Sequence, residues 1–306
     1  MAISLLYLAA CAFEGTSGPL ELPNDDPEQT PGDGNGGGGG GSGSGSGSGV
    51  TDTDGDGVPD STDNCRTVSN AEQYNEDGDL FGDACDNCPH LANSDQADNG
   101  ETGVGATADG IGDACDPNPT RSGDQLALFL GFNEASDFAG WSVAGDQDFT
   151  VANGKLQNRV KTNLALAWNN DLNLTEATLV TKVNYLSLSS SYRYHGVAVV
   201  GRFRRNDDLG TGVGCGELED EDANGGNPFR NGVRYNGGSF TNNTAGNTTL
   251  AAGTSAVYRA TMTINGATCY SGNQTWSVSS SSSYRGAALS VWGASVDLDY
   301  LVAYKR

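Results

Sequence analysis

Hydrophobic and polar residues alternate with a period of two near the end of the chain. The alternation predicts that one set of side chains faces one way and that Ser295, Asp297 and Asp299 face the other. That first set is Val296, Leu298, Tyr300, Val302 and Tyr304. Four further stretches read as strands: 126–132, 177–186, 196–203 and 257–264.

Clusters of glycine, asparagine and serine separate these stretches, and no amphipathic helix of useful length is found. Residues 119–306 are numerous enough for a core of their own. The pattern therefore predicts a mainly β fold, an antiparallel two-sheet jelly-roll sandwich, over 119–306.

The preceding segment, residues 51–118, has a different pattern. It has few large apolar residues, and it carries seventeen acidic side chains against one basic residue, Arg66. Such a segment cannot bury enough apolar surface to offset its chain entropy. Metal ions and disulfides are therefore expected to supply the missing stability. The shortage of lysine and arginine argues against nucleic acid as a partner.

The aspartates of this segment recur at fixed spacing. In a twelve-residue loop that starts at Asp52, acidic side chains occupy positions 1, 3, 5, 9 and 12, and Gly57 stands at position 6. Calcium takes six to eight oxygen ligands, and a loop with acids at these positions supplies them. The expected ligands of the first copy are Asp52, Asp54, Asp56, Asp60 and Asp63, with the backbone carbonyl of Val58 at position 7.

A second copy begins 23 residues later, and a third is incomplete. The residues that correspond in the second copy are Asn75, Asp77, Asp79, Asp83 and Asp86. In the third copy seven inserted residues move the match to an offset of 30, so that positions 1 and 3 in strict register are Gly105 and Thr107. Either Asp98 or Glu101 must then replace the missing carboxylate ligands, or the third site binds calcium more weakly than the first two. The ligands expected there are Asp98, Asp109, Asp113 and Asp116.

The same register predicts the disulfides, although four cysteines can pair in three ways. Position 14 holds Cys65 and Cys88, and position 11 holds Cys85 and Cys115, so each bridge is expected to join one copy to the next. The predicted pairs are Cys65 with Cys85 and Cys88 with Cys115. Cys215 and Cys269 are left to pair with each other, and we expect them to staple the long loop between them.

The run from Asp52 to Asp116 resembles thrombospondin type 3 repeats. The resemblance rests on the aspartate pairs, on Asp-Asn-Cys-Pro at 86–89, on Asn-x-x-Gln at 93–96 and on Gly-x-Gly-Asp-x-Cys-Asp at 110–116. It implies Ca²⁺ as a structural cofactor, wrapped by a chain without a core. Leu80 at a glycine position, Arg66 at a proline position and the insertion from Asn99 depart from the pattern.

Two other interpretations of the acidic segment are open. An acidic run is often only a solvated or disordered face, but disorder does not require cysteines, a fixed period or glycines at fixed offsets. An EF-hand or dockerin module uses the same loop but needs a flanking helix. Pro59 lies inside the loop, and 65–73 is too short and polar for a packed helix.

The first fifty residues are expected to lie outside the folded part. Residues 1–11 end in Leu-Ala-Ala-Cys, which resembles a bacterial lipobox with Cys11 as the lipidated residue, although the stretch has no positive start and is too short to cross a bilayer. The alternative is a buried strand with an inert cysteine. Residues 12–50 are rich in proline, aspartate, glycine and serine, so they predict a disordered linker.

The sandwich has one catalytic candidate, the acidic run Glu217 to Glu221. It resembles the acidic strand of laminarinase-type glycoside hydrolases, in which alternating carboxylates share a cleft. Against this, Asp220 would then be a buried unpaired charge, and the run continues into a loop composition. His90 and His195 are interpreted as ordinary polar residues, and the four tryptophans as core more often than as a sugar platform.

These observations favour a binding protein over an enzyme. The sandwich loosely resembles laminin-G or concanavalin-like jelly rolls, through Phe132, Trp141, Phe149 and the Gly-Lys-Leu at 154–156. We expect a calcium-binding, lipid-anchored protein of the bacterial cell surface, outer membrane or periplasm, whose sandwich binds a glycan or a surface protein in adhesion. The alternatives are a surface glycosidase that uses Glu217 and Glu221 and a purely structural envelope protein.

Overall fold

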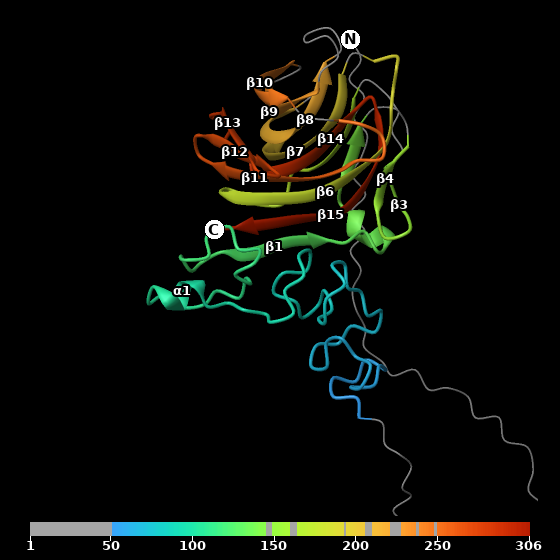
Figure 1. Cartoon of the computed structure of the whole chain (residues 1–306), viewed down its shortest axis with the longest axis vertical. Coiled ribbons are helices and arrows are strands. Elements are labelled where there is room, and N and C mark those ends of the chain that lie inside the picture. Colours follow the sequence, from blue (N-terminus) through green and yellow to red (C-terminus); the bar gives the residue numbers. More distant parts are fainter. Residues whose placement is uncertain are drawn as a thin grey trace, which may run out of the picture. The chain divides into compact units, whose positions relative to one another are not determined.

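The structure is a computed structural model that describes residues 51–144, 149–159, 164–192, 194–205, 210–220, 228–236, 239–247 and 250–306, with the backbone alone over 219–247. Two antiparallel sheets make up most of it (Figure 1). The described part also holds one short helix, α1 (Gly100–Gly103), and one 3-10 turn, Ala135–Phe138. The mainly β, two-sheet prediction is thus confirmed.

The first sheet has eight strands. Seven follow the order β13-β12-β11-β6-β15-β4-β3. The eighth, β1, pairs with residues 301–305 of β15, whereas β4 pairs with residues 296–298 of the same strand. Its strands are β1 (Gln125–Leu130), β3 (Phe149–Val151), β4 (Leu156–Asn158), β6 (Ala177–Leu188), β11 (Ser255–Thr263), β12 (Gly266–Ser271), β13 (Gln274–Ser279) and β15 (Ala294–Lys305).

The second sheet has seven strands, in the order β10-β9-β8-β7-β14-β5-β2. Its strands are β2 (Ser142–Ala144), β5 (Ala165–Asn169), β7 (Tyr194–Arg204), β8 (Thr211–Asp220), β9 (Pro228–Asn236), β10 (Ser239–Asn247) and β14 (Gly286–Trp292). Strand β8 carries glycine at every second position from Gly212 to Gly216. A Cβ atom added at Gly214 would lie 2.3 Å from the carbonyl oxygen of Val199, so the close approach of β8 to β7 requires glycine there.

The main core lies between the two sheets. It combines inward side chains of the first sheet, such as Leu179 and Tyr258, with inward side chains of the second, such as Val199 and Leu289, all 0% exposed. Alternation along each strand places these residues on the inner face. Trp276 and Trp292 are also buried, as the interpretation of tryptophan as a core residue expects.

The face assignment made from the alternation in β15 is wrong in its second half. Val296 and Leu298 point into the main core, but Tyr300, Val302 and Tyr304 belong to a separate apolar cluster on the outer face of the first sheet. A register shift between Leu298 and Tyr300 in the pairing with β6 reverses the faces. An extra residue of this kind is a β-bulge, after which alternate side chains change sides.

The sequence suggested that the third disulfide staples a loop, but the bridge has a different place in the fold. Cys215 lies on β8 of the second sheet and Cys269 on β12 of the first, with their Cα atoms 5.3 Å apart. The bridge therefore joins the two sheets across the core. Among the described residues between the two cysteines, most belong to strands β9, β10 and β11 and not to a loop.

The acidic segment packs on the outer face of the first sheet, and Val50–Arg306 form one compact unit. Ile111, 4% exposed, packs in the cluster of Val180, Tyr300, Val302 and Tyr304. The ring of His90 lies edge-on to Tyr300 with 5.1 Å between centroids, and its Nδ1 lies 3.3 Å from the Tyr304 hydroxyl. Figure 1 shows the segment running beside β1, the strand that pairs with β15. The sandwich thus supplies the apolar surface that residues 51–118 lack.

Residues 1–50, which include Cys11 and the predicted linker, lie outside the described residues. Within the part that the structure describes, no helix has the length and apolar character needed to span a membrane.

Candidate metal centres

The first two loops fold around their own aspartates in the same way. Asp56 accepts the backbone N–H of Val58 through Oδ1 and that of Asn70 through Oδ2, both at 2.8 Å. Asp79 accepts the N–H groups of Phe81 and Asn93 in the same manner, at 2.7 and 2.8 Å. Position 5 therefore fixes the loop to the turn fourteen residues later, and the register read from the sequence holds in three dimensions.

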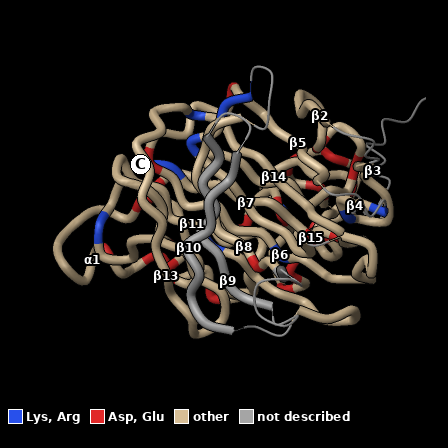
Figure 2. Tube along the Cα trace, turned by 90° about the horizontal axis from the view of Figure 1, so that it is seen from above, with Lys and Arg blue, Asp and Glu red and all other residues tan. Residues whose placement is uncertain are grey.

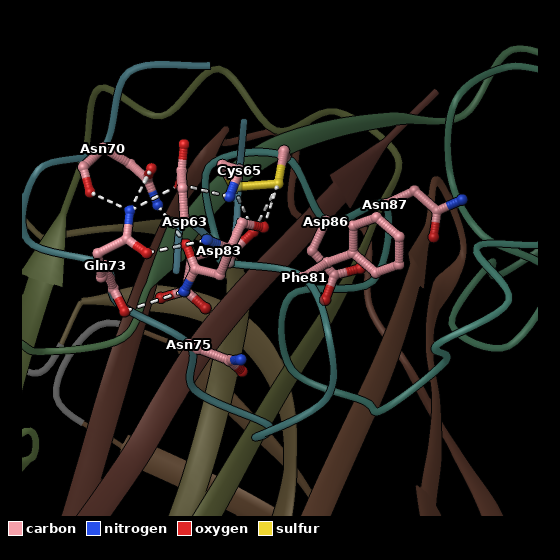
Figure 3. The surroundings of a disulfide bond; sticks show 12 residues. Asp63, Cys65, Asn70, Gln73, Asn75, Phe81, Asp83, Asp86 and Asn87 are labelled. Carbon is pink, nitrogen blue, oxygen red and sulfur yellow. Dashed lines mark hydrogen bonds between the residues drawn. A yellow bond between two sulfur atoms is a disulfide. The ribbon is translucent and has the colours of Figure 1, made fainter. Parts of the chain in front are cut away.

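The Asn-x-x-Gln motif forms that turn. Gln73 has a φ of 54° and Gln96 one of 48°, and each backbone N–H donates to the asparagine carbonyl three residues earlier at 2.7 Å. The Gln73 side chain donates to Asp63 Oδ1 at 2.8 Å and accepts the Asn64 N–H at 2.9 Å (Figure 3). The glutamine thereby orients the position-12 carboxylate.

Three carboxylates of these loops have one oxygen held by a hydrogen bond and the other without a partner. Asp54 Oδ2, Asp63 Oδ2 and Asp77 Oδ2 are buried and accept no hydrogen bond. Asp52, Asp54 and Asp56 each offer an oxygen within 4.8 Å of the other two, and so do Asp77, Asp79 and Asp86. Buried oxygens without donors are costly unless a cation occupies the space between them. The described residues therefore fit one hard divalent cation in each of the first two loops.

The position-9 aspartates are not part of these clusters. Asp60 accepts the N–H and the hydroxyl of Thr53, both at 2.8 Å, and Asp83 accepts the N–H of Glu76 at 2.8 Å. Asp113 in the third copy accepts the N–H groups of Asn99 and Gly100. These three predicted ligands are thus placed to brace their loops.

Both disulfides of the segment join successive copies. Cys65 pairs with Cys85 and Cys88 with Cys115, with Cα atoms 5.6 and 5.7 Å apart, as the repeat register predicts. Figure 3 shows the first bridge beside Asp63 and Asp83, two side chains from neighbouring copies. The bridge thus links the end of one loop to the next.

Two departures from the repeat pattern have visible consequences. Gly57 and Gly110 at position 6 have φ values of 95° and 94°, whereas Leu80, at the same position, does not share this positive φ and is 73% exposed. Gly57 donates its N–H to Asp52, and the N–H of Gly110 donates to Asp98 Oδ2 at 2.9 Å. Asp98 therefore takes position 1 of the third loop despite the insertion.

Two acidic residues missing from the predicted ligand set join the third loop. Glu101 clusters with Asp98 and Asp109, and Asp124 clusters with Asp109 and Asp116. Glu101 stands near the start of the insertion. Because positions 1 and 3 in strict register carry no carboxylate, the sequence already indicated that Glu101 or Asp98 supplies one. Asp124 lies just before β1, in sequence assigned to the sandwich, and no acid stands at the corresponding position of the other copies.

The clustered acids disfavour their own charge. Burial, with the neighbouring Glu101 and Asp124, raises the pKa of Asp116 to about 7. Burial is also the main cause that raises the pKa of Asp77, Asp86 and Asp98 above the usual range. A divalent cation between the carboxylates would stabilise their charged form, so protons compete with the cation at these sites.

The catalytic candidate of the sandwich lies in a different setting. Glu217 is 4% exposed and accepts a hydrogen bond of 3.0 Å from the Tyr258 hydroxyl, which lies 2.8 Å from that of Tyr185. Both tyrosines belong to the main core. The side chain of Glu219 and all of Glu221 lie outside the described residues. Glu217 is therefore enclosed between the sheets.

Comparison with solved structures finds distant likenesses of the sandwich. The carbohydrate recognition domain of Emp46p is 11% identical with a TM-score of 0.44, over 60% of this chain and 98% of that one. The Ca²⁺/Man3GlcNAc-bound exoplasmic/lumenal domain of VIP36 is 11% identical with a TM-score of 0.42, over 60% and 90%. The carbohydrate binding module CBM66 from Bacillus subtilis is 12% identical with a TM-score of 0.37, over 52% and 91%. Such distant likenesses do not bear on the ligand.

Among curated proteins no match is found. The thrombospondin type 3 repeat family matches residues 51–73 and 75–96, which are the first two loops with their turns. The match ends before the third copy, whose ligand positions are rearranged. Residues 51–96 are thus thrombospondin type 3 repeats, a calcium-binding element joined here to a β-sandwich.

Proposed function

We propose that the chain is a calcium-binding protein of the bacterial cell surface, lipid-anchored through Cys11, whose sandwich binds a glycan without catalysing a reaction. Calcium has a structural role in this proposal, since the ligand clusters lie in the repeats that cover the first sheet. The observation that carries the binding role is an open cavity at one end of the second sheet.

This cavity has a volume of about 460 Å³ and combines aromatic with hydrogen-bonding side chains. Its lining residues are Asn170, Asp171, Phe203, Arg204, Ser283, Tyr284 and Arg285. Tyr284 is 36% exposed, and the Arg204 guanidinium lies 5.6 Å from the centroid of its ring. A cavity lined by an aromatic ring and by amide, carboxylate and guanidinium groups suits a ligand with one apolar face and many hydroxyls, such as a sugar.

The walls of the cavity are held in place before any ligand arrives. Asn170 donates to the carbonyl of Arg205 at 3.1 Å and accepts its N–H at 3.2 Å. Arg285 donates to Asn173 at 2.8 Å, and the Ser282 hydroxyl donates to the carbonyl of Arg202 at 2.6 Å. Because loop ordering is a cost of binding, such preorganisation favours affinity.

Two observations support a protein that neither catalyses a reaction at Glu217 nor binds nucleic acid. Glu217 is enclosed in the core with Tyr258, where a sugar cannot reach it. In Figure 2 the described lysines and arginines are spread over separate elements instead of forming one basic stripe, and the formal net charge is −23.

A glycan array probed in millimolar calcium tests the binding role. We expect specific binding that falls about tenfold or more in Tyr284→Ala, since a stacked aromatic ring contributes on the order of 1.4 kcal/mol. Tyr270→Ala is the matched control, because Arg259 covers that ring at 4.3 Å on the first sheet, away from the cavity. Failure of the array to detect any ligand favours a structural envelope protein. Sugar release lost in Glu217→Gln would favour the glycosidase.

The anchor is tested separately. Cells that express the full chain are labelled with a fatty-acid analogue, and we expect label in the wild type and none in Cys11→Ser. Label retained in Cys11→Ser, or absent from both, would overturn the lipid anchor without affecting the glycan proposal.

A further inference from the structure

The third copy holds a buried carboxylate for which the described residues supply no ion pair or hydrogen bond. Glu101 is 0% exposed, and neither Oε1 nor Oε2 has a hydrogen-bond partner. It lies in the first turn of α1 and is the buried residue of that helix. A buried carboxylate without partners is costly, so we expect a positive charge, such as a bound cation, beside it.

The neighbours of Glu101 are also acids. Asp98, Glu101 and Asp109 offer oxygens within 4.8 Å of one another, and Asp109, Asp116 and Asp124 do the same. Asp98 Oδ1 and Asp116 Oδ2 are buried and lack partners as well. Carboxylates that face each other this closely need either shared protons or a cation between them.

The remaining oxygens are fixed as in the first two loops. Asp98 Oδ2 accepts the Gly110 N–H at 2.9 Å, and Asp116 Oδ1 accepts the Asn118 N–H. Asp109 Oδ2 accepts the N–H groups of Gly123 and Asp124, at 2.9 and 2.8 Å. Backbone N–H groups thus orient each of these carboxylates, and Asp98 Oδ1 and Asp116 Oδ2 keep no protein partner and are free to bind a cation.

We propose that this copy is a third calcium site with a rebuilt ligand set, Asp98, Glu101, Asp109, Asp116 and Asp124, which ties the repeat segment to the sandwich. Glu101 replaces the position-3 aspartate that the insertion displaced. Asp124 adds a ligand from the residue before β1, and Arg306 at the end of β15 donates to the carbonyls of Arg121 and Ser122 beside it. The cation therefore joins the insertion, the third loop and the edge of the first sheet.

The site lies next to the contact with the sandwich. Ile111, whose N–H donates to Asp109 Oδ1 at 3.2 Å, packs on Tyr300 and Val302. Filling the site is therefore expected to order the insertion and to hold Ile111 on the sheet. The proposal rests on the calcium-binding role of the repeats and is independent of the glycan.

The test is a calorimetric calcium titration of chelator-treated full chain at pH 7.5, with Glu101→Gln beside Asp95→Asn. Asp95 is an exposed acid of the same segment outside the clusters, so its variant removes one charge and no ligand. We expect at least one calcium fewer per chain in Glu101→Gln and an unchanged number in Asp95→Asn. An unchanged number in both variants overturns the proposal and indicates shared protons.

Hydrogen exchange at 98–126 provides a second readout. Calcium is expected to slow exchange there in the wild type and in Asp95→Asn, but not in Asp124→Asn, which keeps the side-chain volume. Equal slowing in Asp124→Asn would overturn the role of that residue. No calcium binding by the wild type at all would instead refute the calcium role of the first two repeats.

Discussion

Ile111→Ala tests whether the repeat segment is held on the outer face of the sandwich. The substitution deletes three carbon atoms from a side chain that is 4% exposed among Val180, Tyr300, Val302 and Tyr304. At about 0.8 kcal/mol per buried methylene, with a further cost for the cavity left behind, we expect the free energy of unfolding to fall by about 2–4 kcal/mol. The backbone N–H that donates to Asp109 is unchanged, so the calcium number should be unchanged.

Urea denaturation in saturating calcium, followed by tryptophan fluorescence, measures this loss. Leu80→Ala is the matched control, because Leu80 lies in the second loop and is 73% exposed, and we expect a change within about 0.5 kcal/mol. A loss in Ile111→Ala no larger than that in Leu80→Ala would refute the packing of the segment on the first sheet.

Three further predictions concern single residues. Burial lowers the pKa of His90 to about 4. As the pH falls from about 6.5 to 4, the unfolded chain therefore binds a proton at this position before the folded chain does. In calcium, the free energy of unfolding of the wild type should fall by about 2–3 kcal/mol more than that of His90→Gln over this range. Parallel pH profiles of the two proteins would contradict this. Tyr258→Phe removes a donor to buried Glu217 and should cost about 1–3 kcal/mol in urea denaturation, against no significant change in Tyr284→Phe. Asp63→Asn should weaken calcium binding at the first loop about tenfold or more in a titration, because ligand charge sets affinity, and equal affinity would exclude Asp63 as a ligand.

The calcium loops could largely be predicted from the sequence, because their geometry is local. A loop of twelve residues brings its own side chains together, so spacing alone predicted that Asp54 lies near Asp56 and that Asp77 lies near Asp79. The disulfides followed for the same reason, since each joins neighbouring copies. The bracing role of Asp60 was not predictable, because a carboxylate can bind a cation or a backbone N–H from the same position.

The contacts between distant segments could not be predicted in the same way. Asp124 lies fifteen residues after Asp109, to which its N–H donates, and its spacing matches no repeat position that carries an acid. In β15 the alternation was regular through the bulge, so it did not show the change of face. The continuous apolar run from Tyr300 to Tyr304 was the available signal, since such runs are typical of strands buried on both faces.

The central claim is that calcium folds the repeats onto the outer face of the first sheet. Hydroxyl-radical labelling of tyrosines, read by mass spectrometry in calcium and in chelator, tests it most directly. Tyr300 and Tyr304 are 6% and 1% exposed beneath His90 and Ile111, whereas exposed Tyr284 and core Tyr258 serve as internal references. The account predicts that Tyr300 and Tyr304 are protected in calcium and labelled after chelation, while the two references stay constant. Equal labelling of Tyr300 and Tyr304 in both conditions would contradict it.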